Sequence, residues 1–392
     1  MEKLIGFGLA GFGTIGRTHL AAIQANLALH PHDASGNGVN AKPRAVLTRR
    51  PGTCAGLPFE KIYSSMEDLL ADTEVKVLDI CTPNNLHFKA AEAGLIVGKA
   101  VYCEKPLCHE QAEADKLCTL AKQTSLPNQC ALTMRFRPMV GRMKDMLEEG
   151  AIGEPIHFRA SHFHHSYLSA ARPMSWRQDL TQSGGGAVMD LGIHILDLAR
   201  YLLGNIMRLR AVSRIVHKTR ITGNGESVPN NTDEYLKADL ETENSVPGIL
   251  ECSRVSASSM GESFFEIFGT GGSLLLHGER FNKLTLNEAG GSGAQNLGSG
   301  KPGLDRKPGL PGKPGKYESE LKSILPDSRQ SMGAFIDGHA AAIKNIANWA
   351  AGLAPFSGTP TFEEAAKSQA LVHACLRSAA ADGQWERTTA AE

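Results

Sequence analysis

The spacing of apolar positions in the first third of the chain switches repeatedly between strand-like and helix-like periods. Residues 4–27 predict a strand, a glycine-rich turn and a helix, and residues 38–50 predict a second strand. Residues 64–107 continue as helix, strand, loop, helix and strand, and residues 110–125 predict another helix. Such alternation is typical of right-handed βαβ units, which build a parallel sheet. We therefore expect an α/β fold with a doubly wound parallel sheet over residues 1–130.

Beyond residue 130 the predicted elements follow a different pattern. Residues 128–138 predict a last strand of the first sheet, residues 138–153 a helix, and residues 155–165 an alternating strand. Six further strands are predicted at residues 207–217, 234–241, 248–258, 262–270, 272–278 and 282–288. The short turns between them favour a large open, mostly antiparallel sheet with helices on one face. Residues 131–392 thus predict a second, α+β domain, which closes on an amphipathic helix at residues 362–380.

Two features of the second domain bear on assembly. Residues 289–316 have no apolar periodicity and are rich in glycine, proline and lysine, which predicts a flexible surface loop or an arm onto a neighbouring subunit. A large open sheet seldom stays bare. We therefore expect a homodimer or homotetramer formed through this sheet.

The charge balance narrows the classes of partner. Lys plus Arg number 41 and Asp plus Glu number 41, so the formal net charge is zero. This removes any electrostatic argument for nucleic acid or an anionic membrane as a partner. No apolar run approaches the length of about 18 residues that a membrane span needs, and the glycine-rich start lacks the architecture of a cleavable signal. A small, neutral, hydroxylated ligand suits this balance.

The eight cysteines are scattered and form no CxxC pair. Cys81 and Cys103 lie in apolar, strand-like runs. This pattern indicates reduced, buried thiols in a cytoplasmic protein rather than a disulfide framework.

The motif GFGTIG, residues 11–16, connects the first predicted strand to the first predicted helix. Gly11 allows the tight turn, Gly13 lets the backbone approach a pyrophosphate, and Gly16 lets the helix meet the strand. In this βαβ context the motif predicts dinucleotide binding, with Thr14 and Ile15 also at the cofactor. The alternative is a plain structural turn.

The end of the second predicted strand bears on the choice of cofactor. An NAD site usually has Asp or Glu there, but Thr48, Arg49 and Arg50 occupy the positions after this strand. A hydroxyl and two guanidinium groups suit a 2′-phosphate, so NADP is favoured over NAD. The alternative is that both arginines are solvated and NAD binds without the acid.

Two further motifs carry polar groups at sites where ligands collect. The segment CTPNNLH, residues 81–87, and the segment EKP, residues 104–106, each follow a predicted strand at the carboxyl edge of the sheet. The segment 184–204, GGGAVMDLGIHILDLARYLLG, begins a helix with three glycines. In it Asp190 and His194 are four residues apart, which puts both on one helix face.

These motifs, in this order, resemble the glucose–fructose oxidoreductase, inositol dehydrogenase and MocA-like (Gfo/Idh/MocA) family. The resemblance rests on GxGxxG, then EKP, then GGGAxxDxGxHxxD, and covers nearly the whole chain. The segments GAIGEPIHF, residues 150–158, and WRQD, residues 176–179, are also similar. The resemblance implies two domains, a nicotinamide cofactor, and a sugar or cyclitol substrate.

The resemblance assigns catalytic roles to Lys105, Asp190 and His194, and the chemistry agrees. Moving a hydride from a secondary alcohol needs a base for the hydroxyl proton, and histidine exchanges protons near neutral pH. Asp190 is expected to bind substrate hydroxyls and to favour the protonated imidazole. Lys105 is expected to bond the reacting oxygen and the nicotinamide ribose.

Other polar groups are assigned to the two ligands. The resemblance suggests dinucleotide contacts, and the expected cofactor residues include Thr82, Pro83, Asn84, His87, Glu104 and Lys105. The expected substrate residues, besides Lys105, Asp190 and His194, are His164, Tyr167, Trp176 and Arg177. For Trp176 and Arg177 the alternative is ordinary packing. His162 is a further candidate, and Asp197 is expected to be structural. The three glycines are expected to leave room for substrate and cofactor.

A metal site is the alternative for Asp190 and His194. Zinc needs at least one more ligand, which the strand residues His162, His164 and His165 offer in principle. A nicotinamide enzyme needs no metal to move a hydride, so no metal is expected.

The sequence supports three functional hypotheses. The first is an NAD(P)-dependent dehydrogenase or reductase of a sugar, glycoside or cyclitol. The second is an NAD-dependent glycosidase that oxidises the sugar transiently. The third is a non-enzymatic nucleotide-binding protein, against which the presence of Lys105, Asp190 and His194 argues.

Overall fold

The computed structural model describes residues 3–29, 38–257, 263–277, 281–290, 295–297, 314–326 and 331–388. The chain divides into two compact units. The first unit takes residues 1–136 and 320–366, and the second takes residues 137–319 and 367–392. The chain thus passes between the units three times. This division differs from the expected single boundary near residue 130, because the contacts of residues 320–366 group them with the N-terminal unit.

The first unit contains a six-stranded sheet in the order β3-β2-β1-β4-β5-β6. Its strands are β1 (Lys3–Ala10), β2 (Val39–Leu47), β3 (Lys61–Tyr63), β4 (Val77–Ile80), β5 (Ala100–Cys103) and β6 (Asn128–Cys130). Every strand pair in it is parallel. All residues of β4 and β5 are buried, as expected for parallel strands covered on both faces. The predicted doubly wound α/β fold is confirmed.

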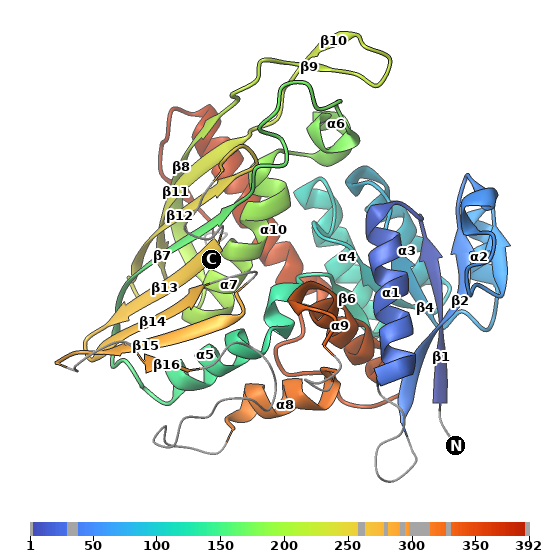
Figure 1. Cartoon of the computed structure of the whole chain (residues 1–392), viewed down its shortest axis with the longest axis horizontal. Coiled ribbons are helices and arrows are strands. Elements are labelled where there is room, and N and C mark those ends of the chain that lie inside the picture. Colours follow the sequence, from blue (N-terminus) through green and yellow to red (C-terminus); the bar gives the residue numbers. More distant parts are fainter. Residues whose placement is uncertain are drawn as a thin grey trace. The chain divides into compact units, whose positions relative to one another are not determined.

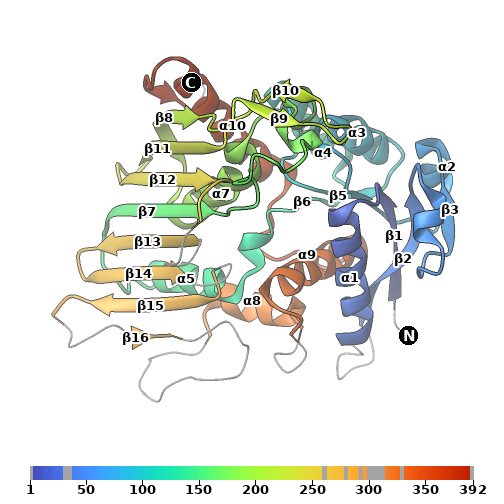
Figure 2. The same ribbon diagram turned by 45° about the horizontal axis from the view of Figure 1, so that its top comes forward.

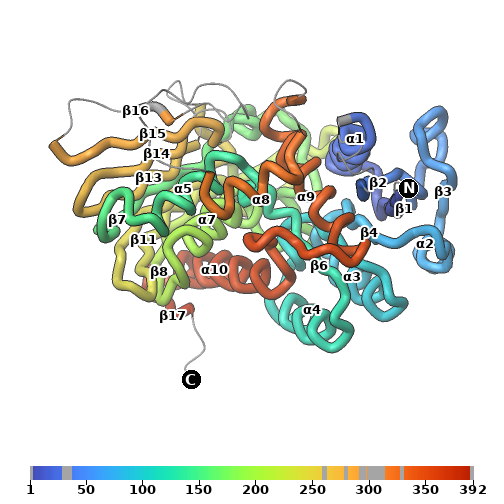
Figure 3. The backbone as a smooth tube through the Cα atoms, turned by 90° about the horizontal axis from the view of Figure 1, so that it is seen from below, coloured from blue at the N-terminus to red at the C-terminus, as the bar shows by residue number. Residues whose placement is uncertain are grey.

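Helices cover both faces of this sheet. Figure 3 shows α1 (Thr14–Leu29) and α9 (Ala334–Ala350) on one face, with α3 (His87–Ile96) and α4 (Gln111–Thr124) on the other. The short helix α2 (Met66–Ala71) packs near β2 and β3. Helix α9 contacts α1 and β2 although more than 280 residues separate them in sequence.

Buried polar side chains fix α9 in the first unit. The Asn345 amide donates to Gln129 Oε1 at 2.7 Å and to Thr359 Oγ1 at 2.8 Å, and its Oδ1 accepts the Phe356 N–H at 2.7 Å. Lys344 Nζ donates to Asn40 Oδ1 at 2.9 Å. Because unpaired buried polar groups are costly, these bonds specify where the helix docks.

The strand predicted at residues 128–138 is shorter in the structure. Strand β6 ends at Cys130, a 3₁₀ turn covers Thr133–Phe136, and α5 (Pro138–Glu148) follows. The apolar residues here are buried in irregular backbone, so their apolar run does not indicate a strand. Pro138 stands in the first turn of α5, where a missing N–H costs nothing.

The described residues of the second unit form a nine-stranded sheet in the order β16-β15-β14-β13-β7-β12-β11-β8-β17. Figure 2 shows this order from β16 to β8. Only the pair β7–β12 is parallel, so the expected large, mostly antiparallel sheet is confirmed. The strands are β7 (Pro155–Phe163), β8 (Ile206–Arg214), β11 (Tyr235–Thr242), β12 (Pro247–Ser253), β13 (Ser263–Gly269), β14 (Gly272–His277), β15 (Lys283–Glu288), β16 (Gln295–Asn296) and β17 (Glu386–Arg387). A separate small hairpin pairs β9 (Thr219–Ile221) with β10 (Ser227–Pro229).

One face of this sheet packs against helices, as Figure 1 shows for α5, α7 (Ile193–Leu203) and the second half of α10 (Phe362–Ala380). The short helix α6 (Leu180–Ser183) precedes α7, and α8 (Lys316–Ile324) follows β16. Strand β11 alternates strictly between buried and half-buried residues, so its second face points away from the helices. Of the predicted loop 289–316, residues 291–294 and 298–313 lie outside the described residues.

Two general properties concern membrane-crossing helices and disulfide bonds. No helix among the described residues is long and apolar enough to cross a membrane. All eight cysteines are free, and seven of them are buried, which agrees with the expected absence of a disulfide framework.

Candidate functional site

The glycine turn of the first unit has the backbone that the motif predicts. Gly11 has φ +97°, a conformation that side-chain-bearing residues rarely adopt. A Cβ on Gly16 would lie 2.6 Å from the Gly11 carbonyl oxygen, so this residue must be glycine for α1 to meet β1. A Cβ on Gly13 would meet nothing within 4 Å, so its backbone is open to a ligand. The turn therefore leaves room for a pyrophosphate at the start of α1.

A pocket of about 590 Å³ adjoins this turn. Four of the predicted cofactor residues line it, namely Gly13, Thr14, Thr48 and Arg50. Arg49 is exposed and is not part of the lining. The lining also contains Phe12, Arg17, Thr18, Ala21, Thr53 and Ile336, which the sequence analysis did not select.

Arg17 is the most informative of these additional residues. Its guanidinium lies 4.8 Å from the centre of the Phe12 ring, so it is stacked beside the glycine turn. Together with Arg50 it gives the pocket two cationic groups. The signal was present in the sequence, since an arginine directly follows the third glycine of the motif.

The carboxyl ends of β4 and β5 bring two predicted loops to the same edge of the sheet. Thr82 and Pro83 are half-buried there. His87 has no exposed surface, and its ring nitrogens lie 2.8 Å from the Pro106 carbonyl oxygen and 2.9 Å from that of Thr82. His87 therefore links the loop after β4 to the loop after β5, beneath the surface that a ligand would touch.

Lys105 is half-buried in the loop after β5, and Glu104 supports it from inside. Glu104 Oε2 accepts the backbone N–H of Lys105 at 3.1 Å, and Oε1 lies 3.0 Å from His19 Nε2. Burial alone would raise the pKa of Glu104, but the hydrogen bond and charge of His19 lower this pKa to about 2. Glu104 is therefore an ionised, buried group of the protein interior.

In the second unit, a carboxylate caps the segment that carries Asp190 and His194. Asp233 is buried and accepts the Gly186 N–H at 2.7 Å and the Val188 N–H at 2.9 Å. Burial raises the pKa of Asp233, and these backbone hydrogen bonds oppose that shift. The cap satisfies donors that a helix start leaves open.

The structure corrects the role expected for the three glycines. A Cβ on Gly186 would lie 1.8 Å from the Asp233 carbonyl oxygen, and Gly184 has φ +75° at the end of α6. The space at Gly186 is thus taken by the protein backbone rather than left for substrate and cofactor. Glycine is required here so that the strand leading to Asp233 can approach.

Asp190 lies in a π-helical turn, Val188–Gly192, and His194 lies in the first turn of α7. The prediction of one α-helical face therefore needs correction, because a π turn changes the angle between residues four apart. Single π turns often mark functional positions. Asp190 and His194 are both half-buried, and the His194 ring centre lies 6.0 Å from that of His162.

Arg254, which the sequence analysis missed, pairs with Asp190. Its Nη2 lies 3.1 Å from Asp190 Oδ2, with the arginine side chain 2% exposed and the aspartate 19% exposed. Arg254 Nη1 also donates to the Arg177 carbonyl oxygen at 3.0 Å, and the guanidinium lies 5.2 Å from the Tyr167 ring centre. One buried cation thus gathers three of the predicted substrate residues.

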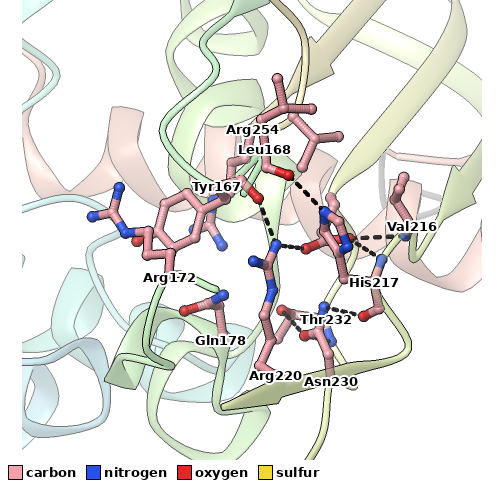
Figure 4. A network of polar contacts seen from close by, with 12 residues as sticks. Tyr167, Leu168, Arg172, Gln178, Val216, His217, Arg220, Asn230, Thr232 and Arg254 are labelled. Atoms are coloured by element: carbon pink, nitrogen blue, oxygen red, sulfur yellow. Dashed lines mark hydrogen bonds and ion pairs between the residues drawn. The ribbon is translucent and has the colours of Figure 1, made fainter. Parts of the chain in front are cut away.

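A second buried ion pair anchors the loop that carries Tyr167 (Figure 4). Arg220 pairs with Glu234 and donates to the carbonyl oxygens of Tyr167 at 2.6 Å and Ser169 at 2.7 Å. Glu234 also accepts the backbone N–H of His217 at 2.7 Å. The Tyr167 ring is held between Arg254 and Arg172, whose guanidinium is 4.3 Å from the ring centre.

The remaining predicted substrate residues lie near this cluster in the second unit. His164 Nδ1 lies 2.9 Å from Ser166 Oγ, and its ring centre is 6.2 Å from that of Tyr167. Trp176 is half-buried with the Arg177 guanidinium 4.5 Å from its ring centre. Asp197 is buried and accepts the Ser368 hydroxyl at 2.9 Å, as expected for a structural group.

Groups of metal-ligand type lie close together in the first unit. Among the described residues, two sets of three have ligand atoms within 4.8 Å of one another: His19 with Asp79 and Cys81, and His19 with Glu104 and His339. Neither set includes Asp190 or His194.

The parallel sheet with its open glycine turn has the architecture of dinucleotide-binding proteins, and comparison with known proteins agrees. Residues 5–131 match the family described as "Oxidoreductase family, NAD-binding Rossmann fold". Residues 140–275 match the family described as "GFO/IDH/MocA C-terminal domain". The chain belongs to the Gfo/Idh/MocA family, and the resemblance drawn from its motifs is confirmed.

Individual relatives are similar over different extents. Levoglucosan dehydrogenase of Pseudarthrobacter phenanthrenivorans is 30% identical over 241 residues, which cover 58% of this chain and 62% of the relative. An NAD binding oxidoreductase from Klebsiella pneumoniae has a similar structure, with a TM-score of 0.84 at 26% identity, over 99% of this chain and 100% of that one. A levoglucosan dehydrogenase in complex with NADH and levoglucosan gives a TM-score of 0.82 at 25% identity, over 99% and 100% of the two chains.

We predict that Gly186→Ala destabilises the second unit, because the new Cβ would overlap the Asp233 backbone. The expected loss in the free energy of unfolding is on the order of 1–3 kcal/mol, the range typical of overpacking. Thermal unfolding measures it. Gly223→Ala is the matched control, since a Cβ there meets nothing within 4 Å. Equal melting temperatures for both variants would contradict the close approach.

Proposed function

We propose that the protein is an NAD(P)-dependent oxidoreductase that moves a hydride between a nicotinamide cofactor and a secondary hydroxyl or keto group of a sugar, glycoside or cyclitol. The observation that carries the proposal is the common sheet edge of the first unit. There, the open glycine turn after β1 and the Lys105 loop after β5 follow strands of one parallel sheet, separated only by β4. Ligands of such sheets bind at this edge.

The residues of the first unit suit a dinucleotide. The Gly13 backbone and the start of α1 would hold the pyrophosphate, and Thr48 with Arg50 would hold the adenosine ribose end. When bound, the nicotinamide supplies the hydride acceptor or donor. Lys105 is positioned by Glu104, and its ammonium would bond the reacting oxygen and stabilise charge that develops on it.

The polar cluster of the second unit supplies the groups that the substrate needs. Asp190, held by Arg254 Nη2 at 3.1 Å, would accept hydrogen bonds from substrate hydroxyls. His194 takes the hydroxyl proton in the oxidation direction and returns it in the reduction direction. Tyr167, Trp176, Arg177 and His164 would line the sugar site, with the half-buried Trp176 ring available for stacking. The relatives named for levoglucosan support a sugar as the substrate class.

We predict that His194→Ala and Lys105→Ala each lower turnover by about 10²–10⁴-fold, because each removes a group that acts on the reacting oxygen. Cofactor affinity should fall much less. Reduced cofactor followed by its absorbance, with levoglucosan, other sugars and inositols as substrates, measures turnover. Near-normal turnover of His194→Ala on the preferred substrate would contradict the proton-transfer role.

The same substrate screen separates the dehydrogenase from the glycosidase alternative. A dehydrogenase accumulates reduced cofactor in proportion to oxidised sugar. Cleavage of a glycoside without net accumulation of reduced cofactor would instead support transient oxidation. No turnover of any sugar or glycoside, with cofactor binding intact, would support a nucleotide-binding role alone.

We propose that NADP is preferred over NAD. The support is the charge of the pocket, in which Arg50 and Arg17 are cationic and no carboxylate is among the lining residues described. Thr48 Oγ1 accepts the Arg50 backbone N–H at 3.1 Å, which fixes the turn at the pocket.

We predict that Arg50→Ala weakens NADP binding by about 10–100-fold, since a charge-assisted hydrogen bond contributes roughly 1.5–3 kcal/mol. NAD binding should change little. Arg49→Ala is the matched control, because Arg49 is exposed like Arg50 but lies outside the pocket lining. Titration calorimetry with both cofactors measures the affinities. Equal losses for NADP and NAD, or a wild-type preference for NAD, would contradict the proposal.

We further propose that the chain forms homodimers or homotetramers through the outer face of the nine-stranded sheet. Val212 on β8 and Ile249 on β12 are 53% and 46% exposed on this face, beside the cross-strand ion pair Arg210–Asp239 at 2.8 Å.

The free cysteines support a cytoplasmic location, which fractionation of cells would test.

We predict that Ile249→Glu dissociates the oligomer, because it replaces an exposed apolar side chain of the outer sheet face with a carboxylate opposite Asp239. Light scattering coupled to size exclusion measures the mass. Leu168→Glu, an exposed apolar residue outside the sheet, is the control. A wild-type monomer would contradict the proposal directly.

A further inference from the structure

A cluster of polar side chains lies inside the first unit, below the sheet edge where the glycine turn and the Lys105 loop meet. It draws on α1, α9 and the ends of β4 and β5. Its members, each less than 9% exposed, are His19, Asp79, Cys81, Tyr102, Glu104 and His339. Ionisable side chains that are this deeply buried must pair with one another, because burial removes their hydration.

His19 holds the centre of the cluster. Its Nδ1 lies 2.8 Å from Asp79 Oδ1, and its Nε2 lies 3.0 Å from Glu104 Oε1. Ionised carboxylates only accept hydrogen bonds, whereas a neutral imidazole carries a single N–H. A ring that faces a carboxylate oxygen at each nitrogen therefore needs both protons. This geometry assigns the imidazolium form to His19.

The electrostatics of the cluster agree with the geometry. Burial lowers the pKa of His19, but Asp79 and Cys81 together outweigh burial and leave this pKa well above the usual value. Burial raises the pKa of Cys81 to about 12, so the thiol next to His19 stays neutral. The Tyr102 ring stacks on His19 at 5.2 Å between centres, and the His339 ring lies 5.0 Å away.

The second oxygen of Glu104 connects this cation to the Lys105 loop. Glu104 Oε2 accepts the backbone N–H of Lys105 at 3.1 Å. His19 itself stands on α1, the helix that begins at the glycine turn. We propose that His19 is a permanently charged positioning residue, which fixes the Glu104 carboxylate and thereby ties the orientation of Lys105 to the helix that follows the glycine turn. The catalytic part of this inference rests on the proposed function.

A bound metal is the competing explanation for the same residues. A tetrahedral zinc with ligand bonds of about 2.0–2.2 Å would keep ligand atoms about 3.4 Å apart. The 2.8 Å separation between His19 and Asp79 is that of a hydrogen bond. Both candidate ligand sets also share His19, whose two nitrogens already face oxygens. The charge-paired arrangement accounts for these distances without a metal.

The first test needs no substrate. In protein labelled with ¹⁵N-histidine, the His19 signals are assigned by their loss in His19→Gln. We expect imidazolium shifts on both ring nitrogens that do not change between about pH 6 and pH 9, the range in which ordinary histidines become neutral. A neutral His19 in this range overturns the proposal. Elemental analysis of the purified protein is expected to find no stoichiometric metal, and one zinc per chain also overturns it.

The second test asks whether the His19 charge affects the hydrogen bond of the Lys105 backbone N–H. Hydrogen exchange of a peptide spanning residues 102–107 is expected to be faster in His19→Gln and in Glu104→Gln than in the wild type, because the Lys105 N–H loses a fixed acceptor. His109→Gln is the matched control, since His109 also faces a glutamate, Glu113 at 3.2 Å, but is partly exposed. Unchanged exchange in folded His19→Gln overturns the link, whether or not the protein oxidises sugars.

The third test uses the oxidoreductase activity. His19→Gln is expected to lower kcat by about 10²-fold, the typical effect of a small misplacement of a reacting group, with a much smaller change in KM. If His19 acts through Glu104, the double variant His19→Gln, Glu104→Gln loses no more kcat than Glu104→Gln alone. Multiplied losses, or a folded His19→Gln with normal kcat, overturn the positioning role. Absence of sugar turnover in the wild type contradicts the proposed function instead, and the first two tests still decide the state of His19.

Discussion

Parallel pairing of β1 with β4, and of β4 with β5, is the constraint on which the first unit depends. Parallel strands end at the same edge, so three loops that are distant in sequence are forced together there. One loop carries the glycine turn, one carries Thr82, and one carries Lys105. The strands themselves are buried on both faces, so any polar side chain that they bring inside must be satisfied locally. One oxygen of Asp79 and one of Glu104 meet that requirement by sharing one histidine, His19.

The second unit also contains buried polar groups that need partners, and these are backbone N–H donors. A helix start inside the protein exposes N–H groups that need acceptors, and Asp233 provides them at Gly186 and Val188. The same segment then holds Asp190 against Arg254. Each unit therefore uses a buried carboxylate to fix a segment that carries a candidate catalytic residue. The carboxylate is Glu104 in one case and Asp233 in the other.

Features that depend on local pattern could be predicted from the sequence. The alternation of periods gave the parallel sheet and the strand series, and the glycine spacing gave a turn whose backbone matches its expected geometry. Features that depend on distant contacts could not. The segment 320–366 carries no local mark of its return to the first unit, and Arg254 stands at the end of an ordinary strand. The π turn at Asp190 could not be predicted either, because its extra residue breaks the helical period on which the prediction rests. The roles of Lys105, Asp190 and His194 remain predictions.

The return of residues 320–366 to the first unit has a consequence for synthesis of the chain. A ribosome makes the whole segment 137–319 before α9 emerges. At a typical rate of about 5–20 residues per second, this delay is on the order of 10–40 s. During that time α1 and β2 lack the helix that covers them, and His19 lacks its neighbour His339. The N-terminal sheet of the nascent chain therefore has one apolar face uncovered during this time. The rate of translation, as well as the rate of folding, then determines when the first unit is complete.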